Sequence, residues 1–267
     1  MIQVAPHETR PGSPIAEREP RSVDRRPAIA TRSGLQALVI EPSGPVVGPP
    51  IVAVHGISRN IGEHRDAFAP VADRLGRRLV LPLFAHGHRG YQRLRGRRGE
   101  PRADHRLWAL LDSMGEDGDV DLVGFSGGAQ FAHRAAMVTP ARVRSLATIS
   151  AGWYTFPDPE LRFPAGTRPG GGRDPAPDLE GFASVRVLVA VGDRDIERDP
   201  ALNIDPEIDR RQGTNRVERS LRWAAAIASI GPAHATEHRL LPATGHSFLD
   251  AVTRGGLVST VERFLGG

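Results

Sequence analysis

The sequence contains no cysteine and no lysine, because all 35 of its basic residues are arginine. Without cysteine the chain cannot form disulfides, thiolate metal sites or a cysteine nucleophile. Without lysine it cannot form a Schiff base or a Walker-type phosphate loop, since both need a lysine amine. No apolar run approaches the roughly 18 residues that a membrane-spanning helix requires. Thiol, Schiff-base and Walker-type chemistry are therefore excluded, and no membrane span is predicted.

The remaining composition is that of an ordinary folded domain. The chain has 267 residues, of which 39% are hydrophobic and 25% charged, and it carries a net charge of +4. Residues 1–30 mix five prolines with arginines and acidic residues and show no apolar period, which predicts a flexible tail before a domain over residues 31–267. A secretory signal would need an apolar stretch near residue 10, where this sequence has proline and charge. We therefore expect a cytoplasmic location.

Short β-branched runs alternate with amphipathic stretches along the predicted domain. The runs predict strands over residues 35–40, 51–54, 79–83, 120–125, 143–150, 185–191 and 237–241. The amphipathic stretches predict helices over residues 64–75, 103–114, 127–138, 216–230 and 257–264. This alternation indicates an α/β fold with a mostly parallel central sheet and helices on both faces.

Two stretches interrupt the alternation. Residues 153–181 contain six prolines and a run of three glycines, which predicts an irregular cap rather than a helical lid. Residues 196–213 form a second interruption. Long connections of this kind usually serve function or are disordered.

The most informative motif is Gly124-Phe125-Ser126-Gly127-Gly128, which follows an apolar strand and opens a helix. This is the setting of a nucleophile elbow, in which the serine occupies a strained turn between strand and helix. Glycines on either side let the strand and the helix approach without Cβ clashes. Ser126 is the predicted nucleophile, and the N–H of Gly127 is a predicted oxyanion donor.

A serine nucleophile needs a base, and the base needs an acid that orients it. His246 follows the last predicted strand and precedes the final helix, so it should lie at the same sheet edge as Ser126. Another strand ends in Gly192-Asp193-Arg194-Asp195, which completes the order serine, acid, histidine. We favour Asp195 over Asp193 as the acid, and Asp158 is a third candidate.

The second oxyanion donor should come from a loop after an earlier strand. Residues 51–54 lead into His55-Gly56-Ile57, and the N–H of Ile57 is the predicted donor. We expect His55 to hold this loop and border the substrate pocket. Trp153, Tyr154 and Phe156 directly follow a strand and are predicted to line that pocket, with ordinary packing as the alternative.

Together, the His-Gly strand end, the Gly-Phe-Ser-Gly-Gly elbow, the Gly-Asp-Arg-Asp strand end and the Gly-His-Ser-Phe loop resemble the α/β-hydrolase superfamily. The resemblance covers about residues 35–267 and has the serine esterases and lipases as its nearest type, without identifying a subfamily. In that superfamily the acid often ends a Gly-x-x-Asp turn, which corresponds to Asp195, and the histidine follows the last strand, which corresponds to His246. The resemblance also implies an oxyanion hole at Gly127 and Ile57.

The predicted function is that of a serine hydrolase that cleaves a carboxylic ester through an acyl-enzyme on Ser126. This mechanism requires no cofactor and no metal. The alternative is an α/β-hydrolase scaffold that binds a small molecule or a protein without hydrolysis, since fold does not fix function.

Residues 89–106 hold seven arginines against Glu100 and Asp104. A solvated loop is the favoured interpretation, and an anionic ester substrate, a nucleic acid or a membrane surface are the alternatives. A nucleic-acid partner is not expected, because Tyr91 is the only aromatic residue available for base stacking before Trp108. His86 and His88 lack the spacing of a metallohydrolase site, so no metal is predicted.

Overall fold

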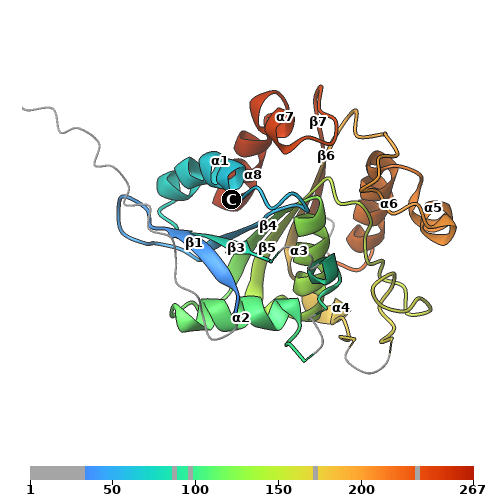
Figure 1. Ribbon diagram of the computed structural model, residues 1–267, viewed down its shortest axis with the longest axis horizontal. Helices are drawn as coiled ribbons and strands as arrows, with labels where there is room; N and C mark the ends of the chain where they lie inside the picture. Colours follow the sequence, from blue (N-terminus) through green and yellow to red (C-terminus); the bar gives the residue numbers. More distant parts are fainter. Residues whose placement is uncertain (1–33, 86–88, 96–98, 171–173, 232–234) are drawn as a thin grey trace, which may run out of the picture.

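A seven-stranded sheet forms the centre of the protein, in the order β1-β3-β2-β4-β5-β6-β7 (Figure 1). The computed structural model describes residues 34–85, 89–95, 99–170, 174–231 and 235–267, so the predicted tail and the segment with His86 and His88 lie outside the described residues. The strands are β1 (Gln36–Ile40), β2 (Ile51–Val54), β3 (Leu79–Leu83), β4 (Val120–Phe125), β5 (Val143–Ile149), β6 (Arg186–Gly192) and β7 (Thr236–Leu241). All seven predicted strands are confirmed: three match at both ends, and the other four differ by a single residue at one or both ends.

Every neighbouring pair of strands is parallel except β1 and β3, which are antiparallel. Strands β2 and β4 lie near the middle and are buried along their whole length. Continuous apolar runs are typical of parallel strands that are covered on both faces. Because the strands are parallel, the loops after β2, β4, β6 and β7 all leave from the same edge of the sheet.

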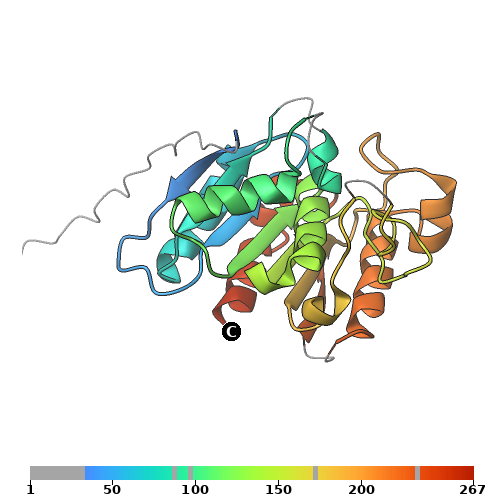
Figure 2. The same ribbon diagram turned by 90° about the horizontal axis from the view of Figure 1, so that it is seen from below.

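Helices cover both faces of the sheet (Figures 1 and 2). One face packs against α1 (Ile61–Arg74), α7 (Phe248–Thr253) and α8 (Leu257–Gly266). The other packs against α2 (Ala103–Ser113), α3 (Gly127–Val138) and α6 (Arg216–Ala228). Alternation along β2 divides its side chains between the two cores, since Ile51 and Ala53 face the first set of helices and Val52 and Val54 the second. Within the described ranges, no helix is long and apolar enough to cross a membrane.

The two interruptions of the alternation differ in structure. Between β5 and the short helix α4 (Leu179–Phe182), the described residues form no helix or strand beyond one isolated bridge, in agreement with an irregular cap. The second interruption contains a helix that was not predicted, α5 (Pro206–Gln212). Asp205 caps this helix by accepting hydrogen bonds from the N–H groups of Glu207 and Ile208. Seven residues are too few to produce a visible apolar period, so only the Asp-Pro start could have revealed α5.

Two short 3-10 helices complete the described elements, η1 (Arg89–Arg93) and η2 (Pro140–Arg142). The helix η1 packs against α3, directly behind the predicted nucleophile elbow. It belongs to the arginine-rich segment that the sequence favours as a solvated loop. Part of that segment therefore lies against the core, where Tyr91 and Leu94 are fully buried.

Candidate active site

Ser126 lies between the end of β4 and the start of α3, in a backbone conformation that side chains rarely adopt. Its φ is 53° and its ψ is −112°, a strained combination for any residue other than glycine. The Ser126 N–H donates to the Ile149 carbonyl at the end of β5, over 2.8 Å. Its own carbonyl accepts from the Gln130 N–H in the first turn of α3, over 3.1 Å. The sheet and the helix thus hold the strained residue from both sides.

The glycines around Ser126 are needed because backbone passes within contact distance of them. A Cβ on Gly124 would overlap the Gly128 carbonyl, and a Cβ on Gly128 would overlap the carbonyl of Val54. The strand β4 can therefore meet the helix α3 only if Gly124 lacks a side chain, and α3 can pass this close to the end of β2 only if Gly128 lacks one. This close approach is the physical reason for the spacing of glycines that the sequence displays.

Ser126, His246 and Asp195 form a continuous chain of hydrogen bonds. The Ser126 Oγ lies 3.0 Å from His246 Nε2, and His246 Nδ1 lies 2.9 Å from Asp195 Oδ2. The Asp195 carboxylate is fully buried, whereas the imidazole of His246 keeps one fifth of its surface exposed. With Nδ1–H donating to the carboxylate, Nε2 is left to accept the serine proton. The three residues come from the loops after β4, β6 and β7.

The other candidate acids occupy different positions. Asp193 accepts a hydrogen bond from the Thr244 N–H over 3.1 Å and so connects the two loops after β6 and β7. Asp158 lies in the irregular segment after β5, where it accepts from the Glu160 N–H over 2.8 Å. In this geometry Asp195 is the carboxylate that reaches His246.

A buried arginine completes the surroundings of Asp195. Arg216, the first residue of α6, is fully buried and donates to Asp195 Oδ1 over 3.2 Å. The same guanidinium donates to both carboxylate oxygens of Asp199, at 2.6 and 3.1 Å. The sequence reasoning missed Arg216, because an arginine at the start of an amphipathic helix is usually solvated. Only the fold places it against the carboxylate.

Gly127 and Ile57 are neighbours in space, as an oxyanion hole would require. The Cγ2 atom of Ile57 lies 3.0 Å from the position that a Cβ on Gly127 would take. Neither N–H takes part in a turn or cap hydrogen bond within the described ranges. The Gln92 side-chain amide nitrogen and the Tyr91 hydroxyl lie 2.7 and 2.9 Å from the same position. No pattern in the sequence predicts that η1 reaches this point.

His55 is held by the backbone on both sides of its ring. Its Nδ1 bonds to the Gly56 carbonyl over 2.7 Å, and its Nε2 accepts from the Phe84 N–H over 3.1 Å. The ring is fully buried, and this burial lowers the pKa of His55 to about 4. Because both ring nitrogens are occupied, His55 fixes the loop that carries Ile57 and has no polar atom left for a substrate.

The three aromatic residues after β5 do not form one wall. Tyr154 is fully buried and stacks on Trp223, with ring centroids 4.5 Å apart. Trp153 is 6% exposed and lies beneath two arginine side chains. Phe156 is half-buried and lines a cavity of about 200 Å³. Tyr154 is thus a core residue, which corresponds to the packing alternative that the sequence left open.

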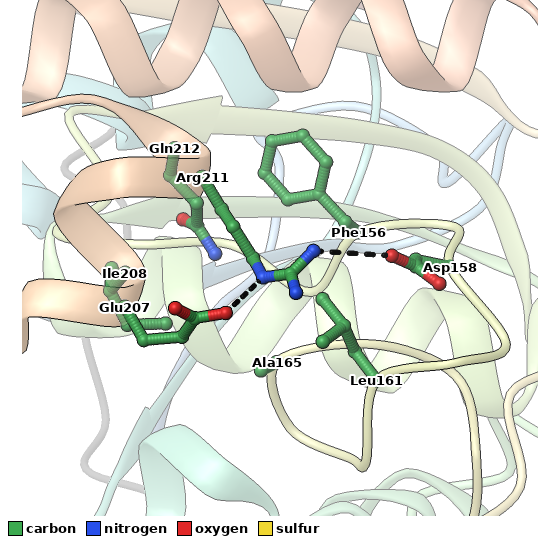
Figure 3. A pocket seen from close by; sticks show the side chains of 8 residues that line it. All are labelled: Phe156, Asp158, Leu161, Ala165, Glu207, Ile208, Arg211 and Gln212. Carbon is green, nitrogen blue, oxygen red and sulfur yellow. Dashed lines mark hydrogen bonds and ion pairs between the residues drawn. The ribbon is translucent and has the colours of Figure 1, made fainter.

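The cavity at Phe156 lies between the irregular segment after β5 and the helix α5 (Figure 3). Its lining is mostly apolar, and at its edge Arg211 pairs with Glu207 at 2.5 Å and with Asp158 at 3.9 Å. None of the residues that line it is Ser126, His246 or Asp195, the three residues joined by the hydrogen bonds described above. In the described part of the chain, no group of three histidine or carboxylate side chains is arranged to hold a metal ion.

Comparisons with known proteins place the fold. No family model matches the chain, and neither does any curated protein. Solved structures do. A poly(3-hydroxybutyrate) depolymerase from Bordetella parapertussis is 23% identical, with a TM-score of 0.70 over 91% of this chain and 89% of that one. The chain has the α/β-hydrolase fold.

Other structures with this fold are similar over comparable lengths. Poly(aspartic acid) hydrolase-1 from Sphingomonas sp. KT-1 is 21% identical, with a TM-score of 0.68 over 86% of this chain and 92% of that one. A naproxen esterase from Bacillus subtilis is 18% identical, with a TM-score of 0.53 over 91% and 92%. The α/β-hydrolase fold that the sequence resemblance predicts is therefore confirmed. At these identities the likeness establishes the fold and leaves the activity open.

Proposed function

We propose that the protein is a serine hydrolase that cleaves a carboxylic ester through an acyl-enzyme on Ser126. The observation that carries this proposal is the hydrogen-bonded chain from the strained Ser126 through His246 to the buried Asp195. A serine hydroxyl is a weak nucleophile unless a positioned base removes its proton. This geometry supplies that base and an acid that orients it.

The proposed reaction has two halves. His246 Nε2 takes the proton of the Ser126 hydroxyl as the oxygen attacks the ester carbonyl, and the N–H groups of Gly127 and Ile57 bind the resulting oxyanion. His246 then gives the proton to the departing alcohol, which leaves the acyl group on Ser126. A water molecule repeats the same steps to release the acid. Asp195 keeps Nδ1 protonated and stabilises the imidazolium that forms in each half.

The similar structures support hydrolysis as the reaction class. They include a protein named an esterase and two named a depolymerase or a hydrolase. A small-molecule ester is our proposed substrate class. The alternative of a binding protein that does not hydrolyse its ligand would leave Ser126 unreactive, and a covalent probe separates the two.

The test is intact-mass analysis after treatment with a fluorophosphonate. We expect one adduct on the wild-type protein and none on Ser126→Ala, with unchanged circular dichroism in both. Ser229→Ala removes an exposed serine at the end of α6 and should keep the adduct, which makes it the matched control. The absence of an adduct on folded wild-type protein would contradict the proposal and favour the binding protein.

A further inference from the structure

Among the described side chains of residues 89–106, one exposed arginine has no acidic partner. Four of the arginines in this segment have described side chains, and three of these pair with carboxylates: Arg95 with Asp174, Arg102 with Asp104, and Arg106 with Glu100. The fourth, Arg93, is exposed and has no ion pair among the described residues. Its charge is therefore available to a ligand.

A second arginine without a carboxylate partner lies inside the protein. Arg134, on α3, is fully buried and donates to neutral oxygens: the Thr155 hydroxyl over 3.0 Å and the carbonyls of Gln92 and Gln130 over 2.5 and 3.3 Å. Its Nη2 atom is buried without a hydrogen-bond partner in the described structure. A buried charge is costly unless it is paired. Arg77, Arg216 and Arg219 follow that rule, because each of these buried arginines contacts a carboxylate.

The two arginines meet at Trp153. The guanidinium carbon of Arg134 lies 4.4 Å from the centre of a Trp153 ring, and that of Arg93 lies 5.5 Å from it. Burial lowers the pKa of Arg134 well below its usual value, and the positive charge of Arg93 lowers it further. Two like charges held this close are mutually unfavourable. An anion bound at the exposed Arg93 would offset the repulsion between the two positive charges.

Gln92 connects this pair of arginines to the proposed nucleophile. Its carbonyl accepts from Arg134, and Arg93 is the next residue in the chain. Its side-chain nitrogen lies 2.7 Å from the position that a Cβ on Gly127 would take, beside the proposed oxyanion hole. On the other side, Gln130 donates its N–H to the Ser126 carbonyl and offers its own carbonyl to Arg134. The uncompensated charge thus borders the elbow that carries Ser126.

We propose that Arg93 and Arg134 form a carboxylate-binding subsite beside Ser126, and that the substrate is an ester that also carries a carboxylate group. This inference rests on the proposed function and names its substrate class. The exposed Arg93 contacts the substrate carboxylate. The buried Arg134 adds a second positive charge and holds Trp153 and Gln92 in place. One exposed arginine suits a small anion better than a nucleic acid, which is held by many phosphate contacts.

The test compares two esters with the same six-carbon acyl chain, mono-4-nitrophenyl adipate and 4-nitrophenyl hexanoate. The adipate ester ends in a carboxylate and the hexanoate ester in a methyl group. Arg93→Gln should lower kcat/KM for the adipate ester by about fivefold, the size expected for one partly exposed ion pair, and leave the hexanoate ester unchanged. Added salt should reduce the difference in the wild type, because exposed charges are screened.

The matched control removes an arginine from the other end of the sheet. Arg263 is exposed near the end of α8, next to Phe264 and Leu265, whose carbonyls bond to Arg186 and Arg144 near the starts of β6 and β5. Arg263→Gln lowers the net charge by the same amount as Arg93→Gln. It should leave kcat/KM for both esters unchanged.

A second pair of esters locates the carboxylate on the alcohol side, with 3-acetoxybenzoate against 3-acetoxytoluene. A selective loss in Arg93→Gln for either charged ester supports the subsite and tells which side of the ester carries the anion. Equal effects on the charged and neutral members of both pairs would overturn the subsite while ester hydrolysis stands. If no ester is cleaved and no fluorophosphonate adduct forms on Ser126, the proposed function fails and the subsite with it.

Discussion

Two buried aspartates lie at opposite ends of the sheet and have different surroundings. Asp121, near the start of β4, accepts hydrogen bonds from Arg77, Arg144 and Ser145. Asp195, after the end of β6, accepts from Arg216 and His246. Both side chains are fully buried, and both contact an arginine.

The difference lies in what the remaining partners can do. The partners of Asp121 are two guanidinium groups, which stay charged, and one hydroxyl, so its network is closed. One partner of Asp195 is an imidazole that can gain and lose a proton and that continues to the strained Ser126. A buried ion pair alone is therefore no sign of catalysis. The titratable partner and the strained serine distinguish the carboxyl end of the sheet.

The largest expected effect is on the rate of the proposed reaction. Asp195→Asn should lower kcat by about 10⁴-fold, because an amide at this position favours the wrong tautomer of His246. Asp193→Asn is the matched control, since an asparagine oxygen can still accept from the Thr244 N–H. Ester kinetics on both variants check this. A fall of similar size in the kcat of Asp193→Asn would contradict the assignment of Asp195 as the acid.

At the other end of the sheet, the effect should be on stability. Asp121→Asn leaves the buried guanidinium of Arg77 without its charged partner, which should lower the free energy of unfolding by about 3 kcal/mol. Urea denaturation measures this change. The kcat of the folded variant should equal that of the wild type, and a parallel loss of kcat would show that the two ends are coupled.

Stability should also depend on pH through two buried histidines. Burial lowers the pKa of His55 and of His64 to about 4, against about 6.5 when the chain is unfolded. Between these values the unfolded chain binds more protons, so stability falls as the pH falls, by about 1.4 kcal/mol per pH unit for each histidine. Urea denaturation from pH 7 to pH 5 measures the slope.

A variant at His64 sharpens this assignment. Its ring stacks on Phe248 with centroids 4.0 Å apart, and phenylalanine can keep that contact. His64→Phe should therefore reduce the slope by the share of one histidine. If the stability of the wild type does not change between pH 7 and pH 5, or if His64→Phe has the same slope as the wild type, the assignment to buried histidines is contradicted.

Asp195, like Asp121, contacts an arginine, and the smallest expected effect comes from removing that arginine, Arg216. Arg216→Met should lower kcat by about tenfold, because one charge-assisted hydrogen bond to Asp195 Oδ1 is lost. Steady-state kinetics on the ester that the wild type cleaves measure this change in kcat.

Arg216→Lys restores the charge and should return kcat toward its wild-type value. Rates are taken per active site titrated with the fluorophosphonate, so partial unfolding does not enter. A kcat per titrated site that is unchanged in Arg216→Met would limit Arg216 to a structural role.

The strands, the elbow and the order of Ser126, Asp195 and His246 could be predicted because each depends on local sequence. Apolar runs define buried strands, and glycines next to a serine between a strand and a helix define a tight turn. Parallel strands end at one edge, so residues after them gather there. The aromatic residues after β5 could not be assigned to a pocket or to the core, because local sequence does not tell which side of a loop is covered.

The sequence by itself thus determined the α/β-hydrolase fold and the predicted nucleophile and base, and it favoured Asp195 as the acid while leaving Asp193 and Asp158 open. The tertiary structure alone decided which carboxylate reaches His246, and it placed Arg216 behind Asp195. Among the described residues, it also left Arg93 and Arg134 without acidic partners, although the sequence favoured a solvated loop around Arg93. The physical reason is that the partners of a charge are set by contacts between residues far apart in the chain, which no local pattern records.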